Sequence, residues 1–474
     1  MGQAAKIFPS ERQQLYDRFA DRLETACHLN RKVVSFQANK DEPLYRWFKY
    51  KEGFSSSLVK YFLTQYSQRP GKILDPFAGV GTALFAAQEL GWKSYGVELL
   101  PVGIFAIQTR EALNTIDEEE LKKVVKNLWA ELDKIETYKN HINHISITQD
   151  AFSEATEIAL NKYLTYCDKI KNSHIKTVLK FAAFSVLEEI SFTRKDGQYL
   201  RWDYRSKRKL PGKPFDIGKI HSFEEAMNRK LSQIISDLSP DKTNTLFDRF
   251  ENKKHEQCPV NIMEGSCLEE LPKFEDNFFD FIITSPPYCN RYDYTRTYAL
   301  ELVYLGCDSD HVRSLRQAML SCTVENKEKT DSLKRFYFSI GRPETFEKVI
   351  EVYNNSGTMA EVNSVLDALN KSDKLNNNNI PRMVKNYFLE LCFVIYEMAR
   401  VVKSAGYCVM VNDNVRYGGE EIPVDLILSE FAENLGFNIN KIFVLPRGKG
   451  NSSQQMGIYG RTEVRKCVYL WQKR

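Results

Sequence analysis

Apolar and polar residues alternate in short blocks over the first hundred positions of the chain. Residues 73–74 form a short apolar run that predicts a strand, and a glycine-containing turn follows it. The next apolar positions recur at helical spacing, so we expect a helix that Thr82 caps, that runs through Leu90 and that Gly91 ends. A second strand is expected at 94–97. A strand, turn, helix and strand in this order predict a parallel sheet.

The segments on either side of this unit have different patterns. Before it, residues 43–67 predict a loop and then a helix whose buried face would consist of Leu58, Val59, Phe62 and Leu63. After it, residues 116–256 contain long helical patterns, such as 175–190, and few apolar strands. We therefore expect a mainly helical insertion there. A second, polar insertion is expected at 307–379.

Strand patterns return in the second half of the chain. We expect strands at 260–263 and 279–283, followed later by a helix that has Pro381 in its first turn, runs to about Lys403 and is broken by Gly406. The remaining residues predict a strand, a helix and a final hairpin, at 407–411, 424–435, 439–445 and 464–471.

Together these patterns predict a doubly wound α/β core that two mainly helical insertions interrupt. Three parts of the chain would build the core, and each insertion would lie between two of them. The boundaries that we expect are 1–115 for the N-terminal part of the core, 116–256 for the first insertion, 257–306 for the middle part of the core, 307–379 for the second insertion and 380–474 for the C-terminal part.

Composition places the chain among ordinary globular proteins. It has 474 residues, of which 43% are hydrophobic and 27% charged, and its 16 Pro and 23 Gly are too few for a disordered or fibrous chain. No apolar run reaches the roughly 18 residues of a membrane-spanning helix, and the first residues lack the apolar core of a signal peptide. The ten Cys include no CxxC pair, and the seven His form no metal-ligand grouping. We therefore expect a cytoplasmic protein with reduced thiols and no metal site.

One short segment holds more positive charge than the balance of the whole chain. Lys and Arg number 66 against 62 Asp and Glu over the full length, whereas eight Lys or Arg face only two Asp between residues 193 and 213. Tyr199, Trp202 and Tyr204 are interleaved with them. Cationic groups neutralise phosphates and aromatic faces stack on bases, so the segment fits a nucleic-acid contact, although a solvated basic loop would look the same. The candidate residues are Arg194, Lys195, Arg201, Arg205, Lys207, Arg208 and Lys209.

The glycine turn after the first strand has the form of a nucleotide site. Gly79 and Gly81 let the backbone approach a ligand closely, and Glu98, at the end of the next strand, can accept hydrogen bonds from two ribose hydroxyls. Leu84 replaces the third glycine of a dinucleotide fingerprint, and there is no phosphate-binding Gly-Lys-Ser/Thr loop. A ribose clamp without a phosphate cradle favours a nucleoside cofactor such as S-adenosylmethionine. A tight turn without a ligand is the alternative.

A second motif follows the strand predicted at 279–283. It consists of Ser285, Pro286, Pro287 and Tyr288, and its two prolines make the strand end stiff. The exocyclic amine of a nucleobase is a poor nucleophile because its lone pair is delocalised into the ring. The Ser285 hydroxyl and the Pro286 carbonyl could accept its protons while Tyr288 stacks on the base, and methyl transfer would then need mainly positioning. A rigid turn with a packing tyrosine is the alternative.

The two motifs together resemble those of the amino-group DNA methyltransferases, which methylate N4 of cytosine or N6 of adenine. The resemblance rests on Asp75-Pro76-Phe77-x-Gly79-x-Gly81-Thr82 and on Ser285-Pro286-Pro287-Tyr288. It covers about 45–105, 257–305 and 380–474. It implies a Rossmann-like methyltransferase core that depends on S-adenosylmethionine. A serine at the first position of the second motif is more typical of the cytosine enzymes than of the adenine enzymes.

The resemblance also implies roles for residues. Ser285, Pro286, Pro287 and Tyr288 would be catalytic, and 116–256 would recognise the target sequence. Arg291, which follows the catalytic motif, would contact DNA, whereas Cys289 is not expected to be a covalent nucleophile because its context differs from that of the cytosine-C5 enzymes. Ser266 stands where many members have Asp, so its role is open. The cofactor would be held by Phe54, Asp75, Phe77, Gly79, Gly81, Thr82, Glu98 and Ser266.

The function that follows is site-specific transfer of a methyl group from S-adenosylmethionine to N4 of cytosine in duplex DNA, with base flipping, in a restriction-modification or defence system. The partners would be double-stranded DNA and a cognate restriction endonuclease, with neither membrane nor metal. Three alternatives remain open at this point. They are N6 of adenine as the target, an RNA substrate, and a DNA-binding subunit without turnover.

Overall fold

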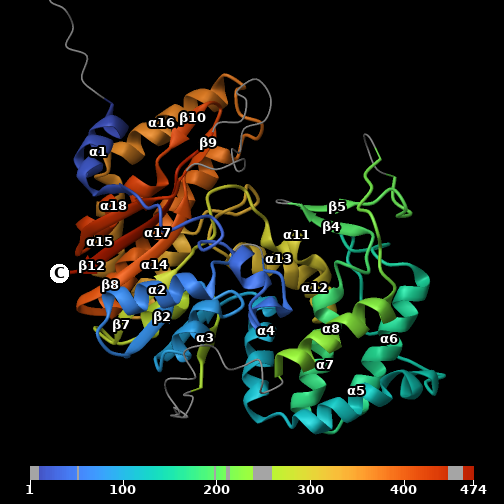
Figure 1. Cartoon of the computed structure of the whole chain (residues 1–474). Coiled ribbons are helices and arrows are strands. Elements are labelled where there is room, and N and C mark those ends of the chain that lie inside the picture. The colour runs from blue at the N-terminus through green and yellow to red at the C-terminus, as the bar shows by residue number, and fades with distance from the viewer. Residues whose placement is uncertain (1–9, 51–52, 197–198, 210–213, 239–258, 447–462) are drawn as a thin grey trace, which may run out of the picture.

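The computed structural model describes residues 10–50, 53–196, 199–209, 214–238, 259–446 and 463–474. These residues form two lobes, one built on a large sheet and one mostly helical, which lie side by side (Figure 1). None of the helices in the described ranges is both long enough and apolar enough to cross a membrane.

The described part of the sheet lobe contains eight paired strands. Only β12 runs antiparallel to its two neighbours, and the other pairs are parallel. This arrangement, with helices on both faces, confirms the predicted doubly wound α/β fold. In spatial order the strands are β1 (Leu23–Thr25), β11 (Phe437–Val444), β12 (Lys466–Lys473), β8 (Val402–Asp413), β7 (Phe279–Thr284), β2 (Lys72–Asp75), β3 (Lys93–Glu98) and β6 (Asn261–Glu264).

The order of the strands reverses between β2 and β7. The chain passes from β2 to β3 and then to β6 on one side, and it returns to place β7 on the other side of β2. Open α/β sheets bind ligands at the carboxyl ends of the strands next to such a reversal, because the connecting helices diverge there and leave a crevice. The fold therefore places a ligand site next to Asp75 and Thr284, the last residues of β2 and β7.

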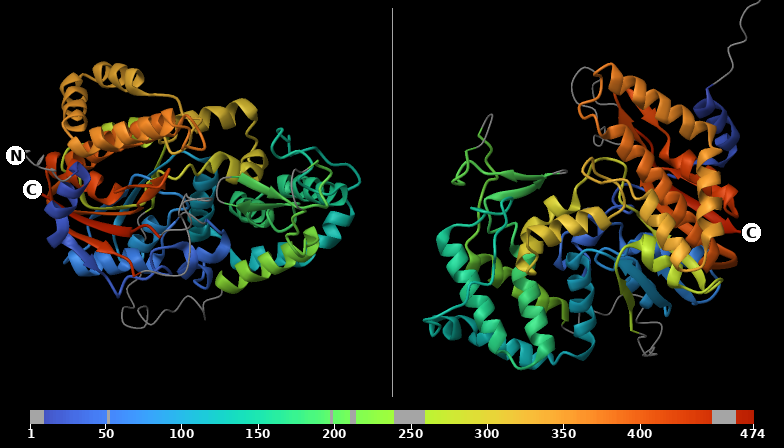
Figure 2. Two further views of the ribbon diagram at one scale, coloured as in Figure 1. Left: turned by 90° about the horizontal axis from the view of Figure 1, so that it is seen from above. Right: turned by 180° about the vertical axis from the view of Figure 1, so that it is seen from behind.

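Helices cover both faces of the sheet, as the left view of Figure 2 shows. Alternate strand residues point to opposite faces, so Ile73 packs against one helix layer and Leu74 against the other. The first layer contains α2 (Ser56–Tyr66) and α3 (Thr82–Gln88). The second contains α1 (Glu11–Phe19), α10 (Cys267–Glu270), α14 (Thr330–Ser339), α15 (Pro343–Asn354), α16 (Gly357–Lys371), α17 (Ile380–Val401) and α18 (Val424–Asn434).

The second lobe has its own core of buried apolar side chains. Helices that flank both site motifs extend from the sheet lobe into it, so the two lobes share part of their packing. A short hairpin, β4 (Thr193–Asp196) and β5 (Tyr199–Trp202), lies on top of this lobe. The helices are α4 (Pro101–Ala112), α5 (Glu118–Asp133), α6 (Glu154–Lys169), α7 (Ser173–Val186), α8 (Phe223–Leu238), α11 (Tyr294–Thr297), α12 (Ala299–Tyr304) and α13 (Ser309–Ala318).

Local sequence explains where the helix before the site begins. The Ser55 hydroxyl accepts a hydrogen bond from the backbone N–H of Leu58, which caps α2. The predicted apolar face of this helix is confirmed, because Leu58, Val59, Phe62 and Leu63 are all buried.

Two details of the prediction are wrong. Thr82 does not cap α3, because the cap position is Gly81, whose positive φ of 79° sets the turn, and Thr82 is the first helical residue. Gly406 does not end the long helix, because α17 ends at Val401 and Gly406 lies within β8. A Cβ at Gly406 would lie 2.9 Å from the carbonyl oxygen of Asp280, so the glycine permits close approach of two strands.

The hairpin β4–β5 was not predicted. It lies in the basic segment, where charged residues hide the alternation of apolar and polar residues that indicates a strand. A smaller hairpin, β9 (Val415–Tyr417) and β10 (Glu420–Ile422), follows β8 at the carboxyl edge of the sheet.

Candidate cofactor and catalytic site

Three strand ends meet at one pocket, which measures about 780 Å³ with the open solvent at its mouth included. Asp75 ends β2, Glu98 ends β3 and Ser285 follows β7, and all three line the pocket. The other predicted site residues in its lining are Phe54, Phe77, Gly79, Thr82, Ser266 and Pro287. Gly81, Pro286 and Tyr288 are not among the lining residues.

The two glycines of the turn have different structural roles. Gly79 has φ +55°, and a Cβ on it would lie 3.1 Å from Cε1 of Tyr50, so this backbone stretch passes close beneath an aromatic ring at the pocket wall. Gly81 has φ +79°, and a Cβ on it would lie 2.8 Å from Cγ1 of Ile107. Gly79 therefore shapes the pocket, whereas Gly81 supports the turn from outside the lining.

Glu98 is buried, and its carboxylate accepts hydrogen bonds from two backbone N–H groups. Its Oε2 accepts from the N–H of Gly79 at 2.7 Å, and its Oε1 accepts from the N–H of Leu100 at 2.6 Å. These bonds fix the carboxylate plane, and each oxygen keeps a further lone pair for a ligand hydroxyl. Burial raises the pKa of Glu98 to about 7, and the two backbone hydrogen bonds oppose that rise.

Asp75 joins the two strands at the reversal point. Its Oδ1 accepts from the N–H of Phe77 at 3.0 Å and from the hydroxyl of Thr284 at 2.7 Å. Burial raises the pKa of Asp75 to about 7, against the effect of these two hydrogen bonds. The pocket thus holds two carboxyl groups that ionise near neutral pH, which suits a ligand that brings a positive charge and hydroxyl donors.

Ser285 is half-buried at the pocket, directly after β7. Its hydroxyl donates to the carbonyl oxygen of Val411 at 3.2 Å and lies 3.3 Å from the hydroxyl of Tyr288. A serine hydroxyl has one proton, so donation to Val411 leaves the lone pairs of Oγ free to accept from a substrate. The first and last residues of the Ser-Pro-Pro-Tyr motif are therefore in contact with each other.

Cys289 directly follows this motif and does not line the pocket. Its side chain is fully buried, and burial raises the pKa of the thiol well above its usual range. Its carbonyl oxygen accepts from the hydroxyl of Tyr417 at 2.7 Å, which ties the loop after β7 to β9. A buried thiol of high pKa carries almost no thiolate, so this cysteine is not an activated nucleophile.

The comparisons with known proteins agree with this geometry. A family described as DNA methylase matches residues 14–102, which include the glycine turn. The type II methyltransferase M.AvaI of Nostoc sp. is 45% identical over 463 residues, which cover 97% of this chain and 92% of that protein. This chain belongs to the amino-group DNA methyltransferases.

Other relatives extend the comparison. The type II methyltransferase M.BsoBI of Geobacillus stearothermophilus is 41% identical to this methyltransferase over 479 residues, covering 98% of this chain and 92% of the relative. M.MvaI of Kocuria varians, also a type II methyltransferase, is 22% identical over 436 residues, covering 89% and 88%. No solved structure matches the chain.

Other residues also line the methyltransferase pocket. Tyr50 and Tyr294 lie close to the two motifs along the chain. Sequence reasoning missed Met319 and Leu320, which lie in 307–379, the predicted second insertion, where nothing in the local sequence indicates a site. Ser266 explains their position in part, because its hydroxyl donates to the carbonyl oxygen of Ala318 at 2.9 Å.

The chemistry of the pocket fits S-adenosylmethionine. A sulfonium and an ammonium group need negative partners, a ribose needs acceptors and an adenine needs apolar walls. Asp75 and Glu98 could supply the first two, and side chains such as Phe54, Phe77 and Leu100 could supply the third. No group of three or more His, Cys, Asp or Glu side chains that could hold a metal ion occurs in the described ranges.

The predicted DNA contacts fall into three groups. Lys195 is not available to DNA, because its ammonium lies 2.5 Å from Oε1 of Glu301 and both side chains are buried. This corrects the prediction for Lys195, which failed because strand alternation turns one basic residue inward. For the other basic residues, contact with DNA stays a prediction.

All five of those arginines are engaged within the protein. Arg205 binds the buried carboxylate of Asp203 at 2.6 Å and holds the pKa of that carboxyl low, at about 2. Arg208 donates to the carbonyls of Ser146 and Gln149. Arg291 donates to the side-chain oxygen of Asn376 at 2.8 Å.

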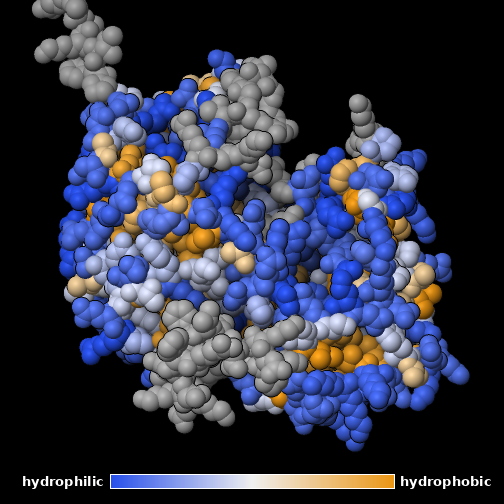
Figure 3. Space-filling view, in the orientation of Figure 1, coloured by the Kyte–Doolittle hydropathy of each residue, from blue (hydrophilic) through white to orange (hydrophobic). Residues whose placement is uncertain are grey.

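The remaining candidates lie at or near the surface. Arg201 is exposed, with its guanidinium 3.6 Å from the ring centre of Phe215 and an ion pair to Asp196 at 3.5 Å. Arg194 is half-buried, and it donates to the carbonyl oxygen of Ile217 at 3.3 Å and lies 3.9 Å from a carboxylate oxygen of Glu188. Lys207 and Lys209 are exposed, with no ion pair to another described residue. Figure 3 shows a hollow between the two lobes, beside the hairpin, with a mostly hydrophilic surface.

Proposed function

We propose that this methyltransferase moves a methyl group from S-adenosylmethionine to the N4 amino group of cytosine in duplex DNA. One observation carries the proposal: Asp75, Glu98 and Ser285 line a single pocket at the strand-order reversal. A donor held by the two carboxylates would have its reactive end beside the Ser285 hydroxyl. Catalysis would then come mainly from holding the methyl donor and the acceptor amine close together in the right orientation.

Each residue has a defined task in this proposal. S-adenosylmethionine, when bound, supplies an electrophilic methyl group. Glu98 accepts from the ribose hydroxyls, and Asp75 faces the positive charge of the methionine part. The Ser285 hydroxyl and the Pro286 carbonyl accept the protons of the exocyclic amine, which frees the nitrogen lone pair for attack. Tyr288 stacks on the extruded base, and its contact with Ser285 sets both groups relative to each other.

The choice of cytosine rests on Ser285. Family members with serine at this position more often methylate cytosine, and members with Asp or Asn more often methylate adenine. A neutral hydroxyl accepts hydrogen bonds from an amine without adding charge to the pocket. That property supports cytosine as the target but is chemically compatible with adenine, so the identity of the product decides between them.

The DNA side of the proposal rests on the hairpin β4–β5 and the loop after it. Arg194, Arg201, Arg205, Lys207, Arg208 and Lys209 lie in this part of the helical lobe, and together they would attract phosphates. The insertion at 116–256 would read the target sequence. Because the relatives carry the name type II methyltransferase, we propose that this enzyme protects the chromosomal DNA of a cytoplasm that also contains a cognate restriction endonuclease.

The test is transfer of a tritiated methyl group. Purified enzyme with labelled S-adenosylmethionine is given unmethylated genomic duplex DNA in one reaction and structured RNA in another. We expect label in DNA and none in RNA. Label in RNA alone would replace the substrate in this proposal. No label in either, together with measurable cofactor binding, would support a binding subunit without turnover.

A further inference from the structure

Lys195 holds the hairpin β4–β5 onto the rest of the molecule. Its side chain is 3% exposed and that of Glu301 is 1% exposed, and their Nζ and Oε1 atoms are 2.5 Å apart. The other carboxylate oxygen of Glu301 is buried and has no hydrogen-bond partner among the described residues. The carboxylate thus depends on Lys195 for its charge balance, since an unpaired buried charge is costly.

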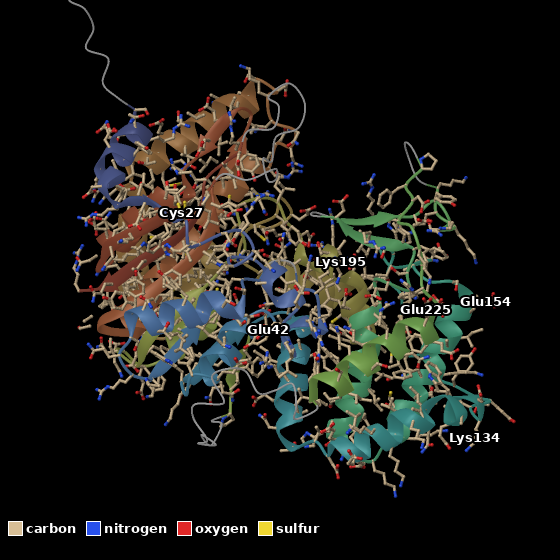
Figure 4. The ribbon with its side chains drawn as sticks, viewed as in Figure 1. Cys27, Glu42, Lys134, Glu154, Lys195 and Glu225 are labelled. Carbon is tan, nitrogen blue, oxygen red and sulfur yellow. The ribbon has the colours of Figure 1, made fainter. Side chains whose placement is uncertain are left out.

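The hairpin has two unlike faces. In its register Arg194 lies opposite Arg201, and Lys195 lies opposite Leu200. Side chains alternate along a strand, so the two arginines share one face and Lys195 shares the other with Leu200, which is buried. Figure 4 labels Lys195 at the base of the hairpin, close to α11 and α12. One face of the hairpin therefore carries the two arginines, of which Arg201 pairs with Asp196, and the other face is anchored by a buried cation.

Two aromatic rings lie next to that buried cation. The Lys195 ammonium is 4.3 Å from the ring centre of Tyr298 and 5.1 Å from that of Phe48. A cation at this distance from a ring attracts it, and more strongly when both are shielded from water. Tyr298 in turn stacks on Tyr50, with ring centres 5.1 Å apart and planes inclined by 17°.

Tyr50 belongs to the wall of the cofactor pocket. Its ring lies so close to Gly79 that a Cβ there would be 3.1 Å from Cε1. The N–H of Gly79 donates to Glu98, the carboxylate that faces the ribose in the proposed function. An unbroken series of contacts therefore leads from the hairpin through Tyr298 and Tyr50 to the glycine turn.

We propose that Lys195 is a positioning residue for the cofactor pocket. Lys195, paired with Glu301, keeps the ring of Tyr298 stacked on that of Tyr50. Tyr50 in turn fixes the position of the glycine turn, so that the N–H of Gly79 can donate to Glu98. Lys195 does not line the pocket, so it acts only through these rings. The inference rests on the proposed function in one respect, namely that the ligand of the pocket is S-adenosylmethionine.

The test is Lys195→Met, which keeps the length of the side chain and removes its charge. The dissociation constant of S-adenosylhomocysteine is measured by calorimetry, and KM and kcat are measured with saturating DNA. We expect the dissociation constant and the KM for S-adenosylmethionine to rise about fivefold or more, the range of typical couplings between sites. The kcat at saturating S-adenosylmethionine should stay within about twofold, because the rings position the donor and do not touch the acceptor base.

A matched control separates positioning from general loss of stability. Arg400 also pairs with a buried glutamate, Glu397, at 2.6 Å and is 11% exposed, but it lies at the end of α17 that is remote from the strand ends forming the pocket. Arg400→Met should lower the melting temperature and leave the dissociation constant unchanged. An equal rise of the constant in both variants, or no rise in folded Lys195→Met, would overturn the proposal.

Conservative variants keep the test decisive if Lys195→Met does not fold. Glu301→Gln preserves volume and loosens the pair, so it should also weaken ligand binding, whereas Lys195→Arg retains a cation beside Tyr298 and should restore most of the affinity. Unchanged affinity in Glu301→Gln would contradict the proposal. If the wild-type protein itself does not bind S-adenosylhomocysteine, the proposed function is wrong. If the wild type binds and the variants bind equally well, only the positioning role of Lys195 is wrong.

Discussion

Charged side chains have different surroundings in the cofactor pocket and in the basic hairpin with its following loop. In the pocket, Asp75 and Glu98 are buried, and each accepts two hydrogen bonds from the protein, mostly from backbone N–H groups fixed by the turn. On the hairpin and the loop after it, Arg205 and Arg208 bind the protein's own acceptors, and Lys207 and Lys209 extend into solvent. The pocket is preformed, whereas only part of the basic segment is available to a partner.

The difference shows which kind of motif can be interpreted from sequence. A glycine turn and a strand end fix backbone geometry, so the residue types determine where the functional groups lie. A run of basic residues fixes only the amount of charge. Tertiary packing decides which cations face outward, and Lys195 shows that one of them can instead be buried.

The largest effect is expected at the acceptor end of the pocket. Ser285→Ala removes the proposed acceptor for the amine protons and should lower kcat by about 100-fold or more, the usual contribution of a group that handles a proton in the reaction. Binding of S-adenosylhomocysteine should change little, because the ribose and methionine contacts remain. Single-turnover kinetics and calorimetry measure the two quantities.

Cys289→Ala is the matched control for this prediction. It alters the same loop at a side chain that does not line the pocket, so its kcat should stay near that of the wild type. Turnover near the wild-type rate in Ser285→Ala would contradict the role of the serine.

The next effect is expected at the donor end. Glu98→Ala removes both carboxylate oxygens that hold the Gly79 and Leu100 N–H groups and that would accept from the ribose. Hydrogen bonds to a charged group contribute about 1.5–3 kcal/mol, so we expect cofactor affinity to fall roughly 10- to 100-fold. DNA affinity, measured by fluorescence anisotropy, should be unchanged. Equal losses of DNA and cofactor affinity would mean that the two regions are not separate.

A smaller effect on cofactor affinity is expected from a change of pH. Burial raises the pKa of Asp75 to about 7, so most of this carboxyl is protonated at pH 6 and ionised at pH 8. A cationic ligand binds the ionised form better, so its affinity should rise by up to about tenfold from pH 6 to pH 8 and then level off. Calorimetry in buffers of different ionisation enthalpy should detect proton release on binding below pH 7.

Asp75→Asn isolates this group. The variant cannot ionise at position 75, so the increase of affinity with pH should shrink to the part contributed by Glu98, whose pKa is also raised to about 7. An unchanged pH profile in Asp75→Asn would show that Asp75 does not face the positive charge of the ligand.

The smallest effect is expected on the hairpin side. Replacing Lys207 and Lys209 with Ala should reduce the slope of log K against log salt for DNA binding by about 1 to 2, roughly one for each phosphate that is no longer neutralised. Melting temperature should not change, since neither side chain has an ion pair to another described residue. Arg205→Ala should instead lower the melting temperature, because it leaves the buried Asp203 carboxylate unpaired. An unchanged salt slope in the double variant would return these lysines to the solvated-loop alternative.

Much of the sheet lobe was predictable from local sequence. The four apolar residues of α2, the strands on either side of the glycine turn and the strand before Ser285 were all expected where they occur. Each is a short element whose pattern is set by burial against the sheet. The errors at Thr82 and Gly406 concern ends of elements, where a glycine can cap, bend or permit close approach, and only the neighbours decide which.

The rest depended on contacts between distant segments. Tyr50 and Leu320 belong to one pocket although 270 positions separate them in the numbering, and no local pattern connects them. The direction of Lys195 depends on Glu301, more than 100 residues further along the chain. A single sequence does not show which distant residues are in contact. Charge and aromatic content could therefore indicate that the partner is a nucleic acid, but not which residues would contact it.

The identity of the methylated base tests the account most directly. Unmethylated genomic DNA is incubated with the enzyme and S-adenosylmethionine, digested to nucleosides and analysed by mass spectrometry. The account predicts N4-methylcytosine, and it predicts that Ser285→Ala yields almost none under the same conditions. N6-methyladenine, or N4-methylcytosine at wild-type level from the variant, would contradict the assignment of the cytosine amine to the Ser285 hydroxyl.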